Sequence, residues 1–410
     1  MNASSWQEGP PEQGVPHDAV AVERSIVGLL RRLVCTPSRA GLDGYEPILG
    51  ILQAWLGEQH LNPRRLQDSV GNAVGLVVDV VGAQPGPHYV LNACVDTAPY
   101  GDERAWDRPP TSGVVVDGWL HGRGSADCKA AVAIFCHLAV ALQSEVSKLA
   151  GTLTVLFDAD EHTGRFGGAK AYFGNGSPRP DVAGVMIGYP GDEWVVVGSR
   201  GFLRARLTVS GTARHSGTSS TATDNAVEKA ALLVRRLGHV QLPHPLNGDF
   251  PLPPKLTVTA IHGGEGFTIV PDICTVDVDV RLTPAFTAEQ AADLLTVTAA
   301  QVDARQPSRR ATAVRLAETW PAYQLDAGTP LVAALTTAAA TMGGHGPVRT
   351  RVVGPSNIGN YLAALGIDAT AGFGVRYRNL HAANECIDLS TVPMVFAAYR
   401  EAVTALLRAL

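Results

Sequence analysis

The stretch GTLTVLFDADEHTG, residues 151–164, joins an apolar run to three acids and a histidine. Such a nearly continuous apolar run is typical of a strand buried on both faces. Residues 73–81 and 87–96 have the same character, and an apolar helical segment over 127–142 separates them from residues 151–160. This order predicts an α/β fold with a mostly parallel sheet, helices on both faces, and ligands at the carboxyl ends of the strands.

The strand pattern changes near residue 198. Residues 202–217 and 274–283 alternate apolar with polar side chains, which is typical of strands with one solvated face. Helical spacing follows each of them, so we predict an inserted α+β lid and dimerisation domain over 198–317. The catalytic domain would then comprise 19–197 and 318–410, after a disordered tail over 1–18.

Composition excludes several classes of partner. The net charge is -5 and there is no basic run, so no nucleic-acid partner is expected. The apolar stretch 130–142 is shorter than the roughly 20 residues of a membrane span, and the N-terminus has no signal-peptide pattern. The six cysteines are widely spaced, as for reduced core thiols. We therefore expect a cytoplasmic protein with no membrane partner.

Polar side chains gather where the predicted strands end. The clusters are NACVDTAP (92–99), GRGSADCK (122–129), DADEHTG (158–164) and NLHAANE (379–385). Taken singly, Asp127 could cap a helix and Asp160 could form a turn. Because an α/β sheet brings its strand ends to one crevice, the clusters together predict a metal site of carboxylates and imidazoles.

The order of these motifs resembles the aminoacylase, acetylornithine deacetylase, succinyl-diaminopimelate desuccinylase and carboxypeptidase G family of zinc hydrolases. The resemblance covers roughly residues 20 to 408, including the insertion. It implies a catalytic domain with two zinc ions bridged by one aspartate. It also implies homodimerisation through the lid domain.

Carried over position by position, the resemblance makes Asp127 the bridging aspartate and His381 a metal ligand. Asp96 would orient a ligand of the first metal. Glu161 would be the general base. Where the family has a second glutamate as ligand, this chain has His162.

Two further positions depart from the family. Cys94 stands where the family has a histidine ligand, and Tyr189 stands where it has an acidic one. We expect one zinc ion, replaceable by cobalt or manganese, on Asp127, His162 and His381. A second ion on Cys94, Asp127 and Tyr189 is expected to bind poorly, because a phenol with a pKa of about 10 must first lose its proton.

The resemblance also implies residues that contact the substrate. His215 matches a lid histidine that would stabilise the oxyanion from the partner subunit. Arg200 and Arg281 match arginines that bind a substrate carboxylate. Thr268 and Asn357 match positions that contact substrate in the family but differ from it in residue type, so we expect both to contact a substrate that differs from the usual one.

The sequence therefore predicts a metal-dependent hydrolase that cleaves the amide bond of an N-acyl amino acid or small peptide. Two alternatives remain at this stage. Cys94 could be the nucleophile of an amide-forming or acyl-transfer enzyme. A catalytically silent relative could instead bind a metabolite, since fold alone does not secure function.

Overall fold

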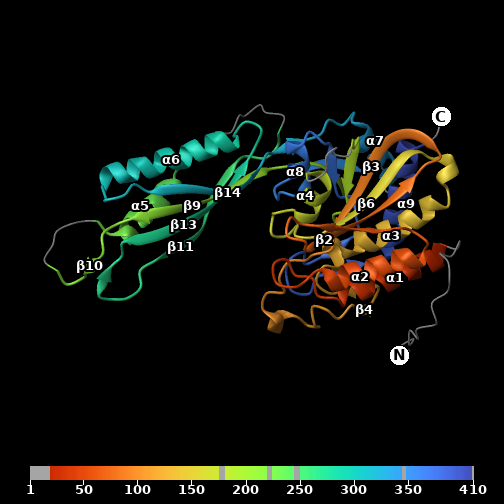
Figure 1. Ribbon diagram of the computed structural model, residues 1–410, viewed down its shortest axis with the longest axis horizontal. Coiled ribbons are helices and arrows are strands. Elements are labelled where there is room, and N and C mark those ends of the chain that lie inside the picture. The colour runs from red at the N-terminus through yellow and green to blue at the C-terminus, as the bar shows by residue number, and fades with distance from the viewer. Residues whose placement is uncertain (1–18, 175–180, 219–223, 244–249, 344–347, 409–410) are drawn as a thin grey trace.

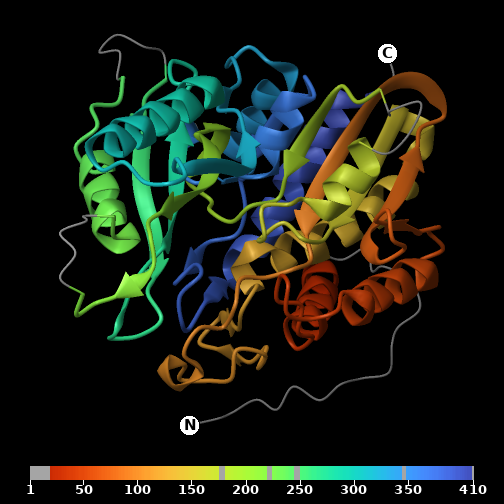
Figure 2. The same ribbon diagram turned by 60° about the vertical axis from the view of Figure 1, so that its left-hand side comes forward.

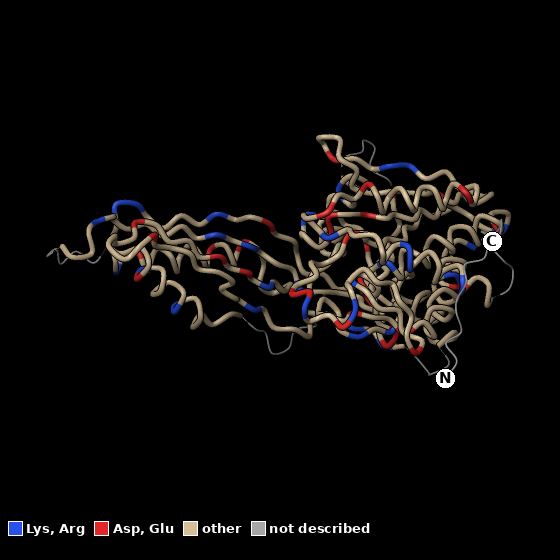
Figure 3. Tube along the Cα trace, turned by 90° about the horizontal axis from the view of Figure 1, so that it is seen from below, with Lys and Arg blue, Asp and Glu red and all other residues tan. Residues whose placement is uncertain are grey.

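The molecule consists of a larger and a smaller body (Figure 1). A computed structural model describes residues 19–174, 181–218, 224–243, 250–343 and 348–408. The predicted tail, residues 1–18, lies outside the described residues. Figure 3 shows Lys and Arg interspersed with Asp and Glu along both bodies.

A nine-stranded sheet forms the centre of the larger body. Its order is β1-β2-β6-β3-β7-β17-β8-β15, with β16 beside β8. The central strands β6, β3, β7 and β17 are parallel, whereas the neighbours toward each edge are antiparallel except for β16. The strands are β1 (Arg64–Gln67), β2 (Ala73–Val81), β3 (Gln84–Cys94), β6 (Ala150–Asp158), β7 (Gly184–Ile187), β8 (Trp194–Ser199), β15 (Tyr323–Gln324), β16 (Arg349–Val353) and β17 (Ala369–Ala371).

Helices cover both faces of this sheet, as its apolar strands require. Along β6, Val155 packs into the core shared with α1, α2, α3, α7 and α9, while Leu156 packs into the core shared with α4 and α8. Helices α1 and α2 lie on the same side of the larger body in both views (Figures 1 and 2). The helices are α1 (Ala19–Val34), α2 (Glu46–Glu58), α3 (Ala130–Gln143), α4 (Gly167–Phe173), α7 (Pro330–Gly343), α8 (Ile358–Ala364) and α9 (Val392–Leu406). The predicted two-sided α/β architecture is confirmed.

Helix α3 is the core helix of this body. Within the described residues, Ser125–Gln143 is the one helical segment with the length and hydropathy of a membrane span, but 83% of its most apolar window is buried inside the fold. It packs against α1, α9 and the sheet. Its apolar character is therefore accounted for by core packing.

The smaller body is an antiparallel sheet with helices on one face. The order is β11-β13-β9-β14, and alternate residues of β13, such as Val276 and Val278, pack against α5 and α6. The opposite face carries ion pairs such as Arg206–Asp277. The elements are β9 (Gly201–Ser210), α5 (Ala226–Leu237), β11 (Lys255–Gly263), β13 (Ile273–Leu282), α6 (Ala288–Arg305) and β14 (Ala313–Trp320). We keep 198–317 as the proposed limits of an inserted domain.

Short strands complete the fold. A small sheet, β18-β19-β5-β4, holds the loop that carries His381, and β10 pairs with β12 at the far end of the smaller body (Figure 1). The strands are β4 (Val115–Val116), β5 (Trp119–His121), β10 (Arg214–His215), β12 (Ile269–Val270), β18 (Tyr377–Arg378) and β19 (Cys386–Asp388).

Candidate metal centre

The predicted site residues converge at the carboxyl ends of neighbouring parallel strands. Cys94 ends β3, Glu161 and His162 follow β6, and Tyr189 follows β7. These three strands are adjacent and parallel, so their ends meet at one edge of the sheet. The turn before α3 and the loop between β18 and β19 complete the site with Asp127 and His381.

Asp127 lies at the centre of the site residues, and its two carboxylate oxygens contact different side chains. Its Oδ2 is 2.9 Å from His381 Nε2 and 3.6 Å from His162 Nε2. Its Oδ1 accepts a 2.6 Å hydrogen bond from Cys128 Sγ. Although burial opposes ionisation, the two imidazoles hold the pKa of Asp127 well below its usual range. One carboxylate thus contacts imidazoles with one oxygen and a thiol with the other.

His162 is a buried imidazole without a matching hydrogen-bond partner. Its side chain is 5% exposed, and neither ring nitrogen makes a hydrogen bond of good geometry within the described part of the chain. Potential ligand atoms of Asp127, His162 and His381 all lie within 4.8 Å of one another. Carboxylate oxygens of Asp96, Glu161 and Asp127 lie 3.3 to 3.6 Å from its ring nitrogens. A carboxylate and two imidazoles form a donor set that suits a divalent ion such as zinc.

Asp96 acts on the loop after β6 rather than on Cys94. Its carboxylate accepts hydrogen bonds from the backbone N–H groups of Glu161, at 3.1 Å, and His162, at 3.0 Å. Asp96 Oδ2 also lies 3.3 Å from His162 Nδ1. Cys94 Sγ makes only a weak contact with the backbone carbonyl of Asp96, at 3.8 Å.

Glu161 has the environment of a proton acceptor. It is 8% exposed, and burial, with the charges of Asp127 and Asp96, raises its pKa to about 7. A general base works best with a pKa near the working pH. Glu161 is therefore suited to take a proton from water and return it to a leaving nitrogen.

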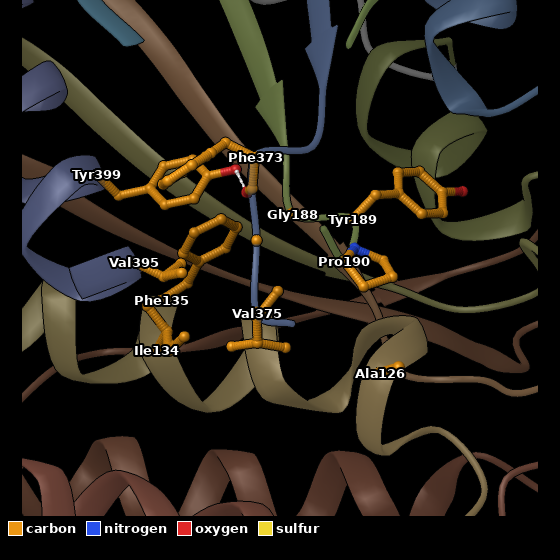
Figure 4. Close-up of a pocket in the computed structure, with 12 residues that line it drawn as sticks. Ala126, Ile134, Phe135, Gly188, Tyr189, Pro190, Phe373, Val375, Val395 and Tyr399 are labelled. Carbon is orange, nitrogen blue, oxygen red and sulfur yellow. Dashed lines mark hydrogen bonds between the residues drawn. The ribbon is translucent and has the colours of Figure 1, made fainter. Parts of the chain in front are cut away.

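Tyr189 contacts the base, contrary to the expected role as a metal ligand. Its hydroxyl donates a hydrogen bond to Glu161 Oε1. Burial and the nearby carboxylates raise its pKa well above the usual value, which disfavours the phenolate that metal binding needs. Figure 4 shows the Tyr189 ring pointing away from the small apolar cavity beside Phe135, Phe373 and Tyr399.

The Tyr189 backbone is held by a glycine contact. A Cβ on Gly374 would lie 2.1 Å from the Tyr189 carbonyl oxygen, so that position requires glycine. Two backbone hydrogen bonds, from Gly374 N to Gly191 O and from Gly191 N to Val375 O, join the segment after β17 to the segment after β7. This packing fixes the backbone that carries the phenol.

Two residues of the site were not predicted. Cys128 follows Asp127 and brings a second thiol toward Cys94, with ligand atoms of Cys94, Asp127 and Cys128 within 4.8 Å of one another. Glu385 is buried and accepts a hydrogen bond from the backbone N–H of Ala126, while pairing with Arg123 at 2.6 Å. Cys128 occurs in the cluster GRGSADCK and Glu385 in NLHAANE. Their position in these clusters is the sequence feature that could have identified them as site residues.

A cavity of about 510 Å³ opens beside the metal centre. Its lining includes the centre's Asp127 and His381, and Arg281 from the smaller body. Arg281 donates to Ser356 Oγ and pairs with Asp279. Asn357 also lines the cavity, and its Oδ1 caps α8 through Gly359 N.

Three other predicted residues lie outside the described lining of this cavity. Arg200 donates to the carbonyls of Gly354 and Pro253, so its contacts are structural. His215 and Thr268 lie together at the β10–β12 ribbon, where Ser216 N donates to Thr268 O. Figure 1 places that ribbon at the end of the smaller body farthest from the larger one.

Known proteins resemble this chain over most of its length. The model of Peptidase family M20/M25/M40 matches residues 90–405. An acetylornithine deacetylase from Photorhabdus laumondii is 28% identical over 299 residues, which are 69% of this chain and 74% of the relative.

Two solved structures share the fold. An M20 family metallo-carboxypeptidase from Sulfolobus solfataricus superposes with a TM-score of 0.77 at 16% identity, covering 92% of this chain and 98% of that one. A Bacillus subtilis protein described as a dinuclear metal-binding M20 peptidase gives 0.70 at 15% identity, covering 95% and 99%. The chain therefore belongs to Peptidase family M20/M25/M40, and it is an amide-bond hydrolase of the metallopeptidase and deacylase class.

Proposed function

We propose that this chain hydrolyses the amide bond of an N-acyl amino acid or small peptide, using one zinc ion held by Asp127, His162 and His381. The observation that carries the proposal is the convergence of their ligand atoms within 4.8 Å, beside Glu161, on one cavity. Two imidazoles and a carboxylate with an open position are a normal catalytic zinc set.

The chain's own residues would handle the proton. A bound divalent ion would act as a Lewis acid and lower the pKa of water from about 15.7 toward roughly 7. Glu161 takes the proton of the attacking water and later delivers it to the leaving nitrogen. Tyr189 stabilises the charged form of Glu161 through its hydroxyl, and Asp96 holds the backbone of the loop that carries Glu161.

Substituting Tyr189→Phe should move the acidic limb of the kcat/KM profile to higher pH. The phenol hydrogen bond lowers the pKa of Glu161, so its loss raises that pKa, and the base is then deprotonated only at higher pH. A hydrogen bond to a charged group is worth about 1.5–3 kcal/mol, or roughly one to two pH units. Tyr377→Phe, in the same cavity, is the control, and an unmoved limb in Tyr189→Phe would contradict this role.

Arg281 is proposed to bind the substrate carboxylate. Arg281→Gln should raise KM by about 10- to 100-fold, the loss expected for a hydrogen bond to a charged group. The effect should vanish with a substrate whose carboxylate is converted to a neutral amide. Arg206→Gln, on the same sheet but paired with Asp277 and exposed, is the matched control. Equal effects on acid and amide substrates would exclude this assignment.

The proposal includes a homodimer formed through the smaller body, in the cytoplasm. His215 and Thr268 lie at its far end, which is consistent with their serving the partner subunit's site. All six cysteines are free, as expected in a reducing compartment.

The cysteine-nucleophile alternative is not favoured. Cys94 is 2% exposed, and the described lining of the cavity does not include it. A hydrogen bond with Cys128, together with burial, raises the pKa of its thiol well above the usual value, whereas a nucleophilic cysteine needs the thiolate. The alternative of a catalytically silent protein that only binds a metabolite is also not favoured, because the chain retains Glu161, Asp127 and His381.

A substrate screen tests the proposal directly. N-acetyl, N-succinyl and N-carbamoyl amino acids and dipeptides would be incubated with the protein supplemented with zinc, cobalt or manganese. We expect hydrolysis of at least one class, abolished by a chelator and restored by zinc. Inertness toward every class despite bound metal would refute it, as would turnover that survives complete removal of metal.

A further inference from the structure

A side pocket of about 320 Å³ adjoins the cavity beside the metal centre. The residues that line both are Pro190, Val196, Arg351, Val353 and Tyr377. A ligand anchored at the metal centre can therefore extend into the side pocket. Cavities of roughly 300–1,000 Å³ hold drug-sized ligands, so there is room for a substrate larger than an acetylated amino acid.

Strands β8 and β16 bring an arginine and a tryptophan together in this side pocket. The two strands are parallel neighbours, with Arg349 opposite Trp194 in the register. Farther along β16, the guanidinium carbon of Arg351 lies 5.6 Å from the centre of the Trp194 ring. This distance is within the range of about 6 Å for a cation–π contact. The contact holds the guanidinium in place without neutralising its charge.

Arg351 differs from the other two arginines of the main cavity in its partners. Arg204 and Arg281 both pair with Asp279, at 3.7 and 2.8 Å. Within the described part of the chain, no carboxylate oxygen lies within 4.0 Å of a nitrogen of Arg351, and no acceptor receives a hydrogen bond from it. Its charge and its donors are therefore open to a ligand.

The acidic side chains near Arg351 do not take the place of that ligand. The carboxylates in the described lining of the main cavity belong to the metal centre. In the side pocket Asp192 pairs with Arg376 at 2.7 Å, and Glu193 is exposed to solvent. A guanidinium presents a planar fork of donors that matches a carboxylate in two hydrogen bonds.

We propose that Arg351, held by Trp194, binds a second anionic group of the substrate, in addition to the carboxylate assigned to Arg281. This inference rests on the proposed function, because both groups belong to one ligand of the same cavity. An N-acyl amino acid has a single α-carboxylate. The second negative charge must therefore lie on the acyl group or on the amino-acid side chain, and the preferred substrates are amides with two carboxylates.

Calorimetry with matched ligands tests the proposal on the full-length, zinc-loaded protein. Glu161→Gln is the background, because we expect it to bind substrate with little turnover. The first ligands are oxalyl-, malonyl-, succinyl- and glutaryl-alanine, each compared with the same compound whose acyl carboxylate is a neutral amide. N-acetyl-aspartate and N-acetyl-glutamate, compared with the asparagine and glutamine compounds, test the side chain as the source of the charge.

The charged member of at least one pair should bind about 10- to 100-fold more tightly than its neutral partner. This is the ratio expected for a hydrogen bond to a charged group. Pairs that differ in the acyl group and pairs that differ in the side chain distinguish the two sources of the anion. Equal binding within every pair, including no binding by either member, would overturn the proposal.

Substitution of Arg351 should remove this preference. Arg351→Gln should weaken the charged ligand by about 10- to 100-fold and leave the neutral one unchanged. Arg351→Lys should keep part of the preference, because it retains the charge but loses the planar fork. Trp194→Leu should lower the preference by about 2- to 5-fold, the value of an exposed cation–π contact.

Arg349→Gln is the matched control. Arg349 is an exposed arginine of the same strand and is absent from the described lining of both cavities, so its loss should change neither ligand. If Arg349→Gln and Arg351→Gln weaken the charged ligand equally, the effect is one of net charge and the proposal fails. Equal weakening of the charged and neutral ligands in Arg351→Gln would also refute it.

Failure of the proposed function gives a different result. The wild-type protein would then bind the doubly charged ligands in a manner that depends on Arg351, yet hydrolyse none of them with zinc bound. Hydrolysis of charged and neutral amides at the same kcat/KM, with equal affinity in the Glu161→Gln background, would leave the proposed function standing and eliminate the anion site at Arg351.

Discussion

Replacing Glu161 by glutamine should lower kcat by about 10² to 10⁴-fold, the usual contribution of a positioned general base. The amide keeps the size of the side chain and can still contact Tyr189, but it cannot accept the proton of the attacking water. Metal content should be unchanged, because the proposed zinc ligands are Asp127, His162 and His381. Steady-state kinetics with the best substrate, together with elemental analysis, measure both quantities.

The neighbouring acid provides the control for this variant. Asp160→Asn removes a carboxylate one residue away, and asparagine tolerates the left-handed backbone of that position, where φ is 67°. We expect near-normal activity in Asp160→Asn. A Glu161→Gln enzyme with undiminished kcat would eliminate Glu161 as the base, and one that has lost its metal would reassign it as a ligand.

Replacing Asp127 by asparagine should remove metal from the whole centre. Asp127 contacts His381 and His162 through one oxygen and Cys128 through the other, so loss of its charge weakens the donor sets on both sides. Metal affinity should fall by more than about 10²-fold, because a direct ligand contributes more than the 10- to 100-fold of an outer contact. Hydrolysis should fall in parallel and recover only in part at high zinc concentration.

Asp158→Asn is the matched control. Asp158 is a buried acid at the end of β6, outside the proposed ligand set, and burial raises its pKa well above the usual value. Its replacement by asparagine changes the shape of the side chain little and leaves the proposed metal ligands in place. Zinc titration by calorimetry should give wild-type affinity for Asp158→Asn, and tight zinc binding by Asp127→Asn would contradict the central position of Asp127.

The periodicity of apolar residues predicted the helices and strands in which one face is strongly apolar. The prediction for 73–81 coincides with β2, and the apolar helical segment predicted over 127–142 overlaps α3. The strands β11 and β14 were missed. Their side chains are largely half-buried or exposed, so burial did not impose a strong apolar pattern on them.

The site was predictable to the extent that strand order determines it. Cys94 ends β3, and Glu161 and His162 follow β6, its parallel neighbour. The ends of adjacent parallel strands lie at one edge of the sheet. Asp127 and His381 came from the family resemblance and lie 2.9 Å apart at their nearest side-chain atoms. The contacts within the group were less predictable, because they depend on the directions of side chains in loops.

The sequence alone determined the buried sheet and the residues at its carboxyl edge. Hydrophobic pattern predicts the first, and the order of the strands along the chain predicts the second. Only the tertiary structure decided the partners within the site. In the folded protein the Tyr189 hydroxyl contacts Glu161, and the Cys128 thiol lies near Cys94 and Asp127. The physical reason is that side-chain direction in a loop depends on the loop's conformation and on close tertiary packing, such as that of Gly374 on the Tyr189 backbone, and local hydrophobic pattern does not reveal either.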